Sequence, residues 1–264
     1  MTQREQQLAR ALAAVQRRIN DAAAAAGRNA EEIELLPVTK FFPATDVAIL
    51  FRLGCRAFGE SREQEAAVKS VEVANLITDS VRWHMVGQIQ RNKTRSIARW
   101  AYAAHSVDSS RLVTALDRAV AAELEAGGRD EPLRVYVQVS FDGDVTRGGV
   151  DARRPELVDQ LCDQAAAAQA LSFVGLMGIP PLDIDPAAAF ARLQAEHQRV
   201  LRTHPQATQL SAGMSDDLET AVKYGSTCVR VGTALLGRRP LTSPSVVTPV
   251  TSSSSHQSFR KGYR

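Results

Sequence analysis

Glu34-Leu-Leu-Pro-Val-Thr-Lys40 is a short apolar run that begins with a charged residue and ends in a lysine. The run is partly β-branched and is bounded by Phe41-Phe-Pro43. This pattern is typical of a buried strand that stops at Lys40. A lysine at the inner end of a buried strand loses part of its hydration, which favours the neutral, nucleophilic amine that a Schiff base requires. Taken alone, this stretch is more simply explained by a solvated lysine where a strand meets a loop.

The same unit, a short strand followed by a helix, recurs along the chain. We expect strands at residues 35–39, 55–59, 82–86, 101–107, 133–140, 171–177, 208–210 and 227–231. Helical spacing is found at residues 3–26, 44–53, 61–73, 92–99, 109–126, 155–170, 186–203 and 216–224. Strict alternation predicts an α/β fold with parallel strands, and eight units favour a closed (β/α)8 TIM barrel over an open doubly wound sheet. The helix at residues 3–26 precedes the first strand and is an extra leading helix.

Composition narrows the class of protein. The formal charge is +3, which demands neither nucleic acid nor an anionic membrane as a partner. The three cysteines, Cys55, Cys162 and Cys228, are far apart and indicate neither a disulfide framework nor a metal site. No secretory signal is seen, and no apolar run approaches the roughly 18 residues of a membrane span. We therefore expect a soluble, cytoplasmic protein with a barrel domain at residues 1–240 and a disordered Ser/Thr/Pro-rich tail at residues 241–264.

Two loops near the carboxyl terminus could bind phosphate. Gly232-Thr233 follows the last strand and opens an apolar helical turn, whose first backbone N–H groups would point at the mouth of the barrel. The loop Ser211-Ala-Gly-Met-Ser215-Asp-Asp217 offers two hydroxyl groups at the previous strand end. An ordinary loop and an ordinary helix cap remain alternative explanations for these two stretches.

Two polar residues lie on the strands themselves. Arg230 shares a strand face with Gly232, and it could form a structural ion pair or donate to an acceptor on a bound ring. His84 could be a satisfied core histidine or a ligand-binding residue. The usual motifs of dinucleotide-binding, P-loop, zincin and α/β-hydrolase proteins do not occur.

Six motifs together resemble the YggS-type pyridoxal phosphate homeostasis family, whose fold is similar to the alanine racemase N-terminal domain. The resemblance spans roughly residues 5–240, in the family's order. The motifs are Pro37-Val-Thr-Lys40, Phe58-Gly-Glu60, Trp83-His-Met-Val-Gly-Gln-Ile-Gln-x-Asn-Lys93, Gly175-Leu-Met-Gly-Ile-Pro180, Leu210-Ser-Ala-Gly-Met-Ser-Asp-Asp217 and Val229-Arg-Val-Gly-Thr233.

This resemblance implies a set of cofactor-binding residues. Lys40 would form a Schiff base with pyridoxal 5'-phosphate (PLP), and Arg230 would face the pyridine nitrogen. Ser211 or Ser215, with the amides of Gly232 and Thr233, would hold the phosphate. His84 and Ser61 are further candidates at the same strand ends, and we expect no metal and no catalytic residue.

Two departures from the family pattern stand out. Ser61 replaces the usual asparagine after Gly-Glu, so it offers less hydrogen bonding to the cofactor. Arg147 stands in the fifth loop where the family commonly has a lysine, which puts a secondary transfer of the cofactor through that position in doubt.

The resemblance implies a protein that buffers or delivers PLP, balances amino-acid and keto-acid pools and has no turnover of its own. We expect a monomer that makes transient contact with PLP-dependent apo-enzymes. The alternative is a PLP-dependent amino-acid racemase, which needs a second base opposite the lysine. That base is missing unless another chain or a residue such as Tyr102 or Tyr136 supplies it. A barrel that has lost the cofactor and serves as an interaction module is the third hypothesis.

Overall fold

The computed structural model of the protein describes residues 1–143, 148–181 and 184–238. Eight parallel strands form the sheet, in the spatial order β1-β9-β8-β7-β5-β4-β3-β2. They are β1 (Glu34–Pro37), β2 (Ala57–Glu60), β3 (Arg82–Met85), β4 (Ala101–Val107), β5 (Leu133–Ser140), β7 (Leu171–Gly178), β8 (Gln209–Ser211) and β9 (Cys228–Val231).

The barrel closes between its first two strands. Val38 forms an isolated parallel bridge with Gly59, and Thr39 N donates to Gly59 O at 2.9 Å. This contact joins β1 to β2, the two ends of the sheet order. The predicted (β/α)8 barrel is therefore confirmed.

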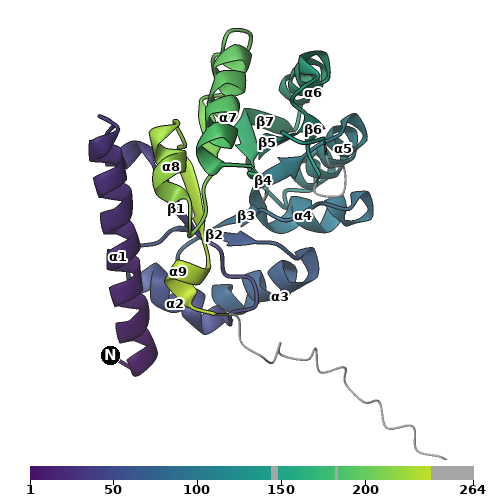
Figure 1. Ribbon diagram of the computed structural model, residues 1–264. Coiled ribbons are helices and arrows are strands. Elements are labelled where there is room, and N and C mark those ends of the chain that lie inside the picture. Colours follow the sequence, from purple (N-terminus) through teal and green to yellow (C-terminus); the bar gives the residue numbers. More distant parts are fainter. Residues whose placement is uncertain (144–147, 182–183, 239–264) are drawn as a thin grey trace, which may run out of the picture.

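Helices cover the outside of the barrel (Figure 1). They are α1 (Gln3–Ala25), α2 (Ala44–Arg52), α3 (Glu63–Ala74), α4 (Thr94–Trp100), α5 (Ser110–Glu125), α6 (Pro155–Ala167), α7 (Pro186–Leu201), α8 (Leu218–Lys223) and α9 (Thr233–Leu236), with 3-10 turns at Ala30–Glu32 and Arg91–Lys93. A two-residue strand that the sequence did not predict, β6 (Val150–Asp151), pairs with β5. The expected tail at residues 241–264 lies outside the described residues, as does the end of the barrel domain at residue 240.

The large core lies between the strands and the helices. Aliphatic side chains of β4, β5 and β7 pack against α5, α6 and α7, and a second cluster joins β1 and β9 to α1, α2 and α8. Among the described residues, the apolar clusters in the interior of the barrel are small, such as the one around Leu36 and Cys228. Polar side chains therefore occupy much of the interior. A buried polar side chain is tolerated there where it has a hydrogen-bond partner.

The leading helix α1 packs along one side of the barrel (Figure 1). Thr2 and Glu5 close its amino-terminal end in a capping box, and Leu8, Leu12 and Val15 are buried on its inner face. It lies against α8 and α9. In the described part of the chain, no helix is both long and apolar enough to span a bilayer.

We predict that Gly87→Ala destabilises the fold by about 1–3 kcal/mol, the usual cost of forcing an extra methyl group into a packed site. Gly87 lies two residues after the end of β3, and a Cβ atom there would lie 2.1 Å from the backbone oxygen of Ser61. The matched control is Gly128→Ala, because its Cβ would meet the flexible end of the Glu123 side chain at 2.6 Å. Urea denaturation measures both variants, and equal midpoints would contradict the prediction.

Candidate functional site

Lys40 lies in a turn beyond the carboxyl end of β1, and its side chain is exposed. The expectation that Lys40 ends a buried strand is wrong. Regular pairing stops at Pro37, the closing bridge is made by Val38, and the chain then turns toward solvent. Phe41 follows with φ of 70°, a left-handed conformation that is uncommon for a residue other than glycine. Lys40 Nζ lies 6.0 Å from the centroid of the Phe41 ring.

A buried lysine on α3 holds this turn in place. Lys69 Nζ donates to Thr39 O at 2.9 Å, to Glu60 Oε1 at 2.7 Å and to Glu65 Oε1 at 3.1 Å. Glu65 Oε1 also accepts from Phe41 N at 2.6 Å, so the residues on both sides of Lys40 are fixed to α3. Each ammonium hydrogen of Lys69 has an acceptor, which leaves Lys69 unsuited to act as a nucleophile.

Lys69 was not predicted from the sequence. Its i,i+4 spacing from Glu65 is a visible signal, but that spacing is common on solvated helix faces. Burial raises the pKa of Glu60, and Lys69 opposes this shift. The buried carboxylate therefore depends on Lys69 for its charge balance.

Arg230 is the buried cation of the barrel interior. Its Nη1 donates to Ser211 Oγ at 2.6 Å, and its Nη2 donates to Gly178 O at 3.1 Å. Burial lowers the pKa of Arg230, but an arginine remains protonated near neutral pH. Two contacts on β8 and β7 thus fix the plane of the guanidinium group. These two contacts use Nη1 and Nη2 of the guanidinium group.

Two histidines extend this contact deeper into the barrel. Ser211 Oγ lies 2.8 Å from His105 Nδ1, and His105 Nε2 lies 2.9 Å from His84 Nδ1. In the described part of the chain, the buried His84 Nε2 has no hydrogen-bond partner. Burial is the main cause that lowers the pKa of His84 to about 3 and the pKa of His105 well below its usual value. Both rings are therefore neutral at physiological pH.

Ser211 on β8 and His84 on β3 are thus buried and linked through His105. His105, which links them, was not predicted. Its signal in the sequence is a polar residue inside the apolar strand at residues 101–107, but nothing local indicates that its partner is more than a hundred positions away.

The two candidate phosphate loops lie beside each other. Ser215 Oγ accepts from Ala234 N at 3.2 Å, at the start of α9. Gly213 O accepts from Arg230 N at 2.9 Å, and a Cβ on Gly213 would approach that of Ala221 to 2.5 Å. Arg18 of α1 donates to Ser215 O at 2.8 Å, so the leading helix supports this loop. Unlike Ser211, Ser215 therefore lies where Gly232 and Thr233 begin α9.

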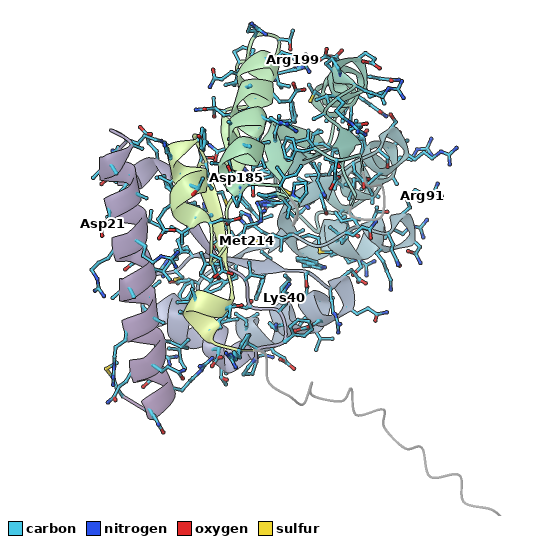
Figure 2. All side chains as sticks on the ribbon, in the orientation of Figure 1. Asp21, Lys40, Arg91, Asp185, Arg199 and Met214 are labelled. Carbon is cyan, nitrogen blue, oxygen red and sulfur yellow. The ribbon has the colours of Figure 1, made fainter. Side chains whose placement is uncertain are left out.

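The Lys40 turn meets these loops through the pairing of β1 with β9. Val38 N donates to Val231 O at 2.9 Å, and a Cβ on Gly232 would lie 3.5 Å from Val38 O. Figure 2 labels Lys40 and Met214, which mark the loops after β1 and β8. An exposed amine, a helix start and a buried cation thus converge at one end of the barrel.

Two other residues singled out from the sequence, Ser61 and Arg147, differ in whether the structure describes them. Ser61 follows β2 and lies against Gly87, at the same strand ends as Lys40. Arg147 lies outside the described residues. Within the described ranges, no group of histidine, cysteine and acidic side chains could hold a metal ion.

We predict that the protein loses stability as the pH falls below about 6.5, the usual pKa of an unfolded histidine. Because the folded-state pKa of His84 is about 3 and that of His105 is also lowered, the unfolded chain binds protons in this range that the folded chain does not. Each histidine should reduce the free energy of unfolding by about 1.4 kcal/mol per pH unit. Urea titrations from neutral to acidic pH measure the slope. In the double variant His84→Asn/His105→Gln the slope should be smaller, and an unchanged slope would contradict the prediction.

Comparisons with known proteins identify the family of this chain. Residues 11–240 match the family model described as alanine racemase, N-terminal domain. A protein of Mycobacterium tuberculosis named pyridoxal phosphate homeostasis protein is 65% identical over 248 residues, which cover 91% of this chain and 96% of that protein. An Escherichia coli protein of the same name is 36% identical, over 88% of this chain and 97% of that protein.

Solved structures give the same result. PipY of Synechococcus elongatus, solved with PLP bound, has a TM-score of 0.72 at 31% identity and covers 88% of this chain and 100% of its own. The alanine racemase of Corynebacterium glutamicum has a TM-score of 0.59 at 15% identity, with 88% of this chain and 60% of that chain covered, which shows a shared fold. The chain therefore belongs to the alanine racemase N-terminal domain family and, within it, to the pyridoxal phosphate homeostasis proteins.

Proposed function

We propose that this chain binds pyridoxal 5'-phosphate at the carboxyl end of its barrel, with Lys40 as the covalent attachment point, and serves to buffer and deliver the cofactor in the cytoplasm. The observation that carries the proposal is the convergence of the exposed Lys40 amine, the start of α9 and the buried Arg230 at one barrel end. The homologues' name and the PLP bound to PipY support the same ligand for this chain.

The residues at this end fit a phosphorylated pyridine aldehyde. An aldehyde needs an accessible amine, and Lys40 is exposed on a turn whose flanking residues are held by Lys69 and Glu65. A phosphate needs backbone N–H groups and hydroxyls, which Gly232, Thr233 and Ser215 offer. We propose Ser215 as the phosphate-binding serine, because Ser211 is turned toward the interior. Ser61 remains a proposed contact at the rim.

Arg230 would meet the ring nitrogen through its Nε–H. An arginine only donates hydrogen bonds, so the nitrogen that faces it must be an acceptor and carry no proton. The bound ring then withdraws electrons from a neighbouring carbon less strongly than a protonated pyridinium would. This property favours a carrier over an enzyme that abstracts protons from amino acids.

The positions of the two candidate second bases also favour a carrier. Tyr136 is buried in the interior and stacks on His105, with 4.1 Å between the ring centroids. Tyr102 lies where β4 begins, between the guanidinium groups of Arg82 and Arg134, each 5.5 Å from its ring. Arg82 begins β3, so this end of the barrel is opposite to Lys40. Tyr102 therefore lies away from a substrate attached near Lys40, and Tyr136 is engaged by His105.

The same proposal includes a monomeric state, delivery of PLP to apo-enzymes, and balanced amino-acid and keto-acid pools. The exposure of Lys40 supports delivery, because a cofactor that must leave again needs an attachment point that water can reach. Hydrolysis of the imine by one water molecule would regenerate the amine and the aldehyde.

We expect the purified protein to gain a visible absorbance band with PLP and to retain one reduced adduct per chain on Lys40 after borohydride treatment. Peptide mapping by mass spectrometry locates the adduct. Lys40→Met should abolish both signals, because the amine is lost while most of the aliphatic chain remains. The matched control is Lys223→Met, which removes another exposed lysine and should change neither signal. An adduct on a different residue would refute the site.

A second measurement separates the carrier from the racemase. The PLP-loaded protein is incubated with single amino acids in D2O, and deuterium at Cα is followed by NMR. A carrier should show no incorporation above that of free PLP. Incorporation that depends on Lys40 would favour the racemase.

A further inference from the structure

We propose that Arg230 sets the direction of a hydrogen-bond relay through Ser211, His105 and His84, so that both histidines carry their proton on Nε2, and that this relay in turn fixes the guanidinium group. His84, His105 and Ser211 are then positioning residues that act through Arg230. The part of this inference that concerns PLP rests on the proposed function. The part that concerns the tautomers does not.

The relay is continuous in the structure. The consecutive distances are 2.6 Å from Arg230 Nη1 to Ser211 Oγ, 2.8 Å from Ser211 Oγ to His105 Nδ1, and 2.9 Å from His105 Nε2 to His84 Nδ1. All four side chains are buried, with exposed fractions of 5% or less. Bulk water therefore does not compete for these contacts.

The direction of the relay follows from Arg230, because a guanidinium group can only donate hydrogen bonds. Arg230 donates to Ser211 Oγ, and a hydroxyl that accepts from a cation becomes a better donor. Ser211 then donates to His105 Nδ1. His105 must carry its proton on Nε2, which donates to His84 Nδ1, so the proton of His84 is also on Nε2.

An alternative acceptor for the Ser211 hydroxyl lies close by. Ser211 also contacts the thiol of Cys228, whose pKa is raised, chiefly by burial. A thiol is a weak acceptor, whereas an imidazole nitrogen without a proton is a strong one. The hydroxyl hydrogen therefore favours His105 over Cys228.

Charges at the far end of the relay do not reverse it. Arg82 and Arg134 interact electrostatically with His84, and their positive charge would favour a His84 ring whose Nε2 carries no proton. Glu34 offsets this charge, because it accepts from Arg82 at 2.8 Å and also interacts with Arg134. Arg230, by contrast, is joined to the relay by a direct charge-assisted hydrogen bond.

The relay matters for the site because Ser211 provides one of the two contacts that hold Arg230. Without an acceptor at His105 Nδ1, the Ser211 hydroxyl would be free to rotate and its lone pair would no longer be fixed toward Nη1. Gly178 O would then be the remaining described contact. A loosely held guanidinium would present its Nε–H to a ring nitrogen in many orientations.

Nitrogen-15 NMR of the PLP-free full chain at neutral pH tests the direction, because it distinguishes the protonated from the bare nitrogen in each imidazole. We expect His84 and His105 to be Nε2–H tautomers. An Nδ1–H tautomer at either position would overturn the proposal. In Arg230→Met the single tautomer of His105 should be lost, whereas Arg230→Lys, which keeps a cationic donor, should retain it. If neither variant folds, Ser211→Ala should release the His105 tautomer in the same way, and a retained Nε2–H form would count against the relay.

Two substitutions at His105 separate its two contacts. The amide oxygen of His105→Asn can occupy the place of Nδ1, and the amide of His105→Gln reaches the place of Nε2. Hydrogen exchange of Arg230 Nε–H should remain slow in His105→Asn and become about tenfold faster in His105→Gln, the factor expected for one lost hydrogen bond. Equal exchange in the two variants would refute the positioning role.

The same pair distinguishes this inference from the proposed function. PLP should bind His105→Gln about tenfold more weakly than His105→Asn, again the factor of one hydrogen bond. Both variants should still form the reduced adduct on Lys40. Absence of the adduct in the parent protein would refute the proposed function and leave the tautomer result standing.

Discussion

The hydrogen bond from Val38 N to Val231 O joins the first strand of the chain to the last, and the candidate site depends on it. Parallel pairing of β1 with β9 brings two carboxyl ends together, so the turn that carries Lys40 lies beside Gly232. The closing bridge from Val38 to Gly59 then fixes the same segment from its other side. β1 stands at one end of the strand order, so it gains a neighbour on its second edge only because the barrel closes. Closure of the barrel therefore also fixes the position of the Lys40 turn.

The polar interior has a cost that the rest of the molecule must offset. A buried group without a partner destabilises a protein by about 1–3 kcal/mol. Among the described residues, His84 Nε2 and Glu60 Oε2 are buried polar atoms without a partner. Each belongs to a network that leads to the site, one through His105 to Arg230 and the other through Lys69 to the Lys40 turn. The aliphatic layer between strands and helices is extensive enough to support both.

Sequence reasoning reached the fold because alternation of strands and helices is a local pattern, repeated eight times. It missed β6, since two residues carry no periodicity. It also placed Lys40 at a buried strand end, because the sequence does not show where pairing stops. Lys69 on α3 and His105 on β4 were missed for a related reason. Their partners Thr39 and Ser211 lie 30 and 106 positions away, and the residues of a single helix or strand do not report such contacts.

Two lysines near the site have opposite environments, and the contrast explains how one chain could hold a reactive aldehyde without consuming it. Lys69 is buried, and its ammonium hydrogens are engaged by Thr39 O, Glu60 and Glu65. Lys40 extends from the turn that this network fixes and remains open to water. An enzyme that stabilises a carbanion gains from excluding water around its lysine. A carrier gains from the opposite arrangement, because water must reach the imine before the cofactor can leave. Under the proposed function, the hydrogen-bonded backbone and the exposed amine of the Lys40 turn suit reversible storage of the cofactor.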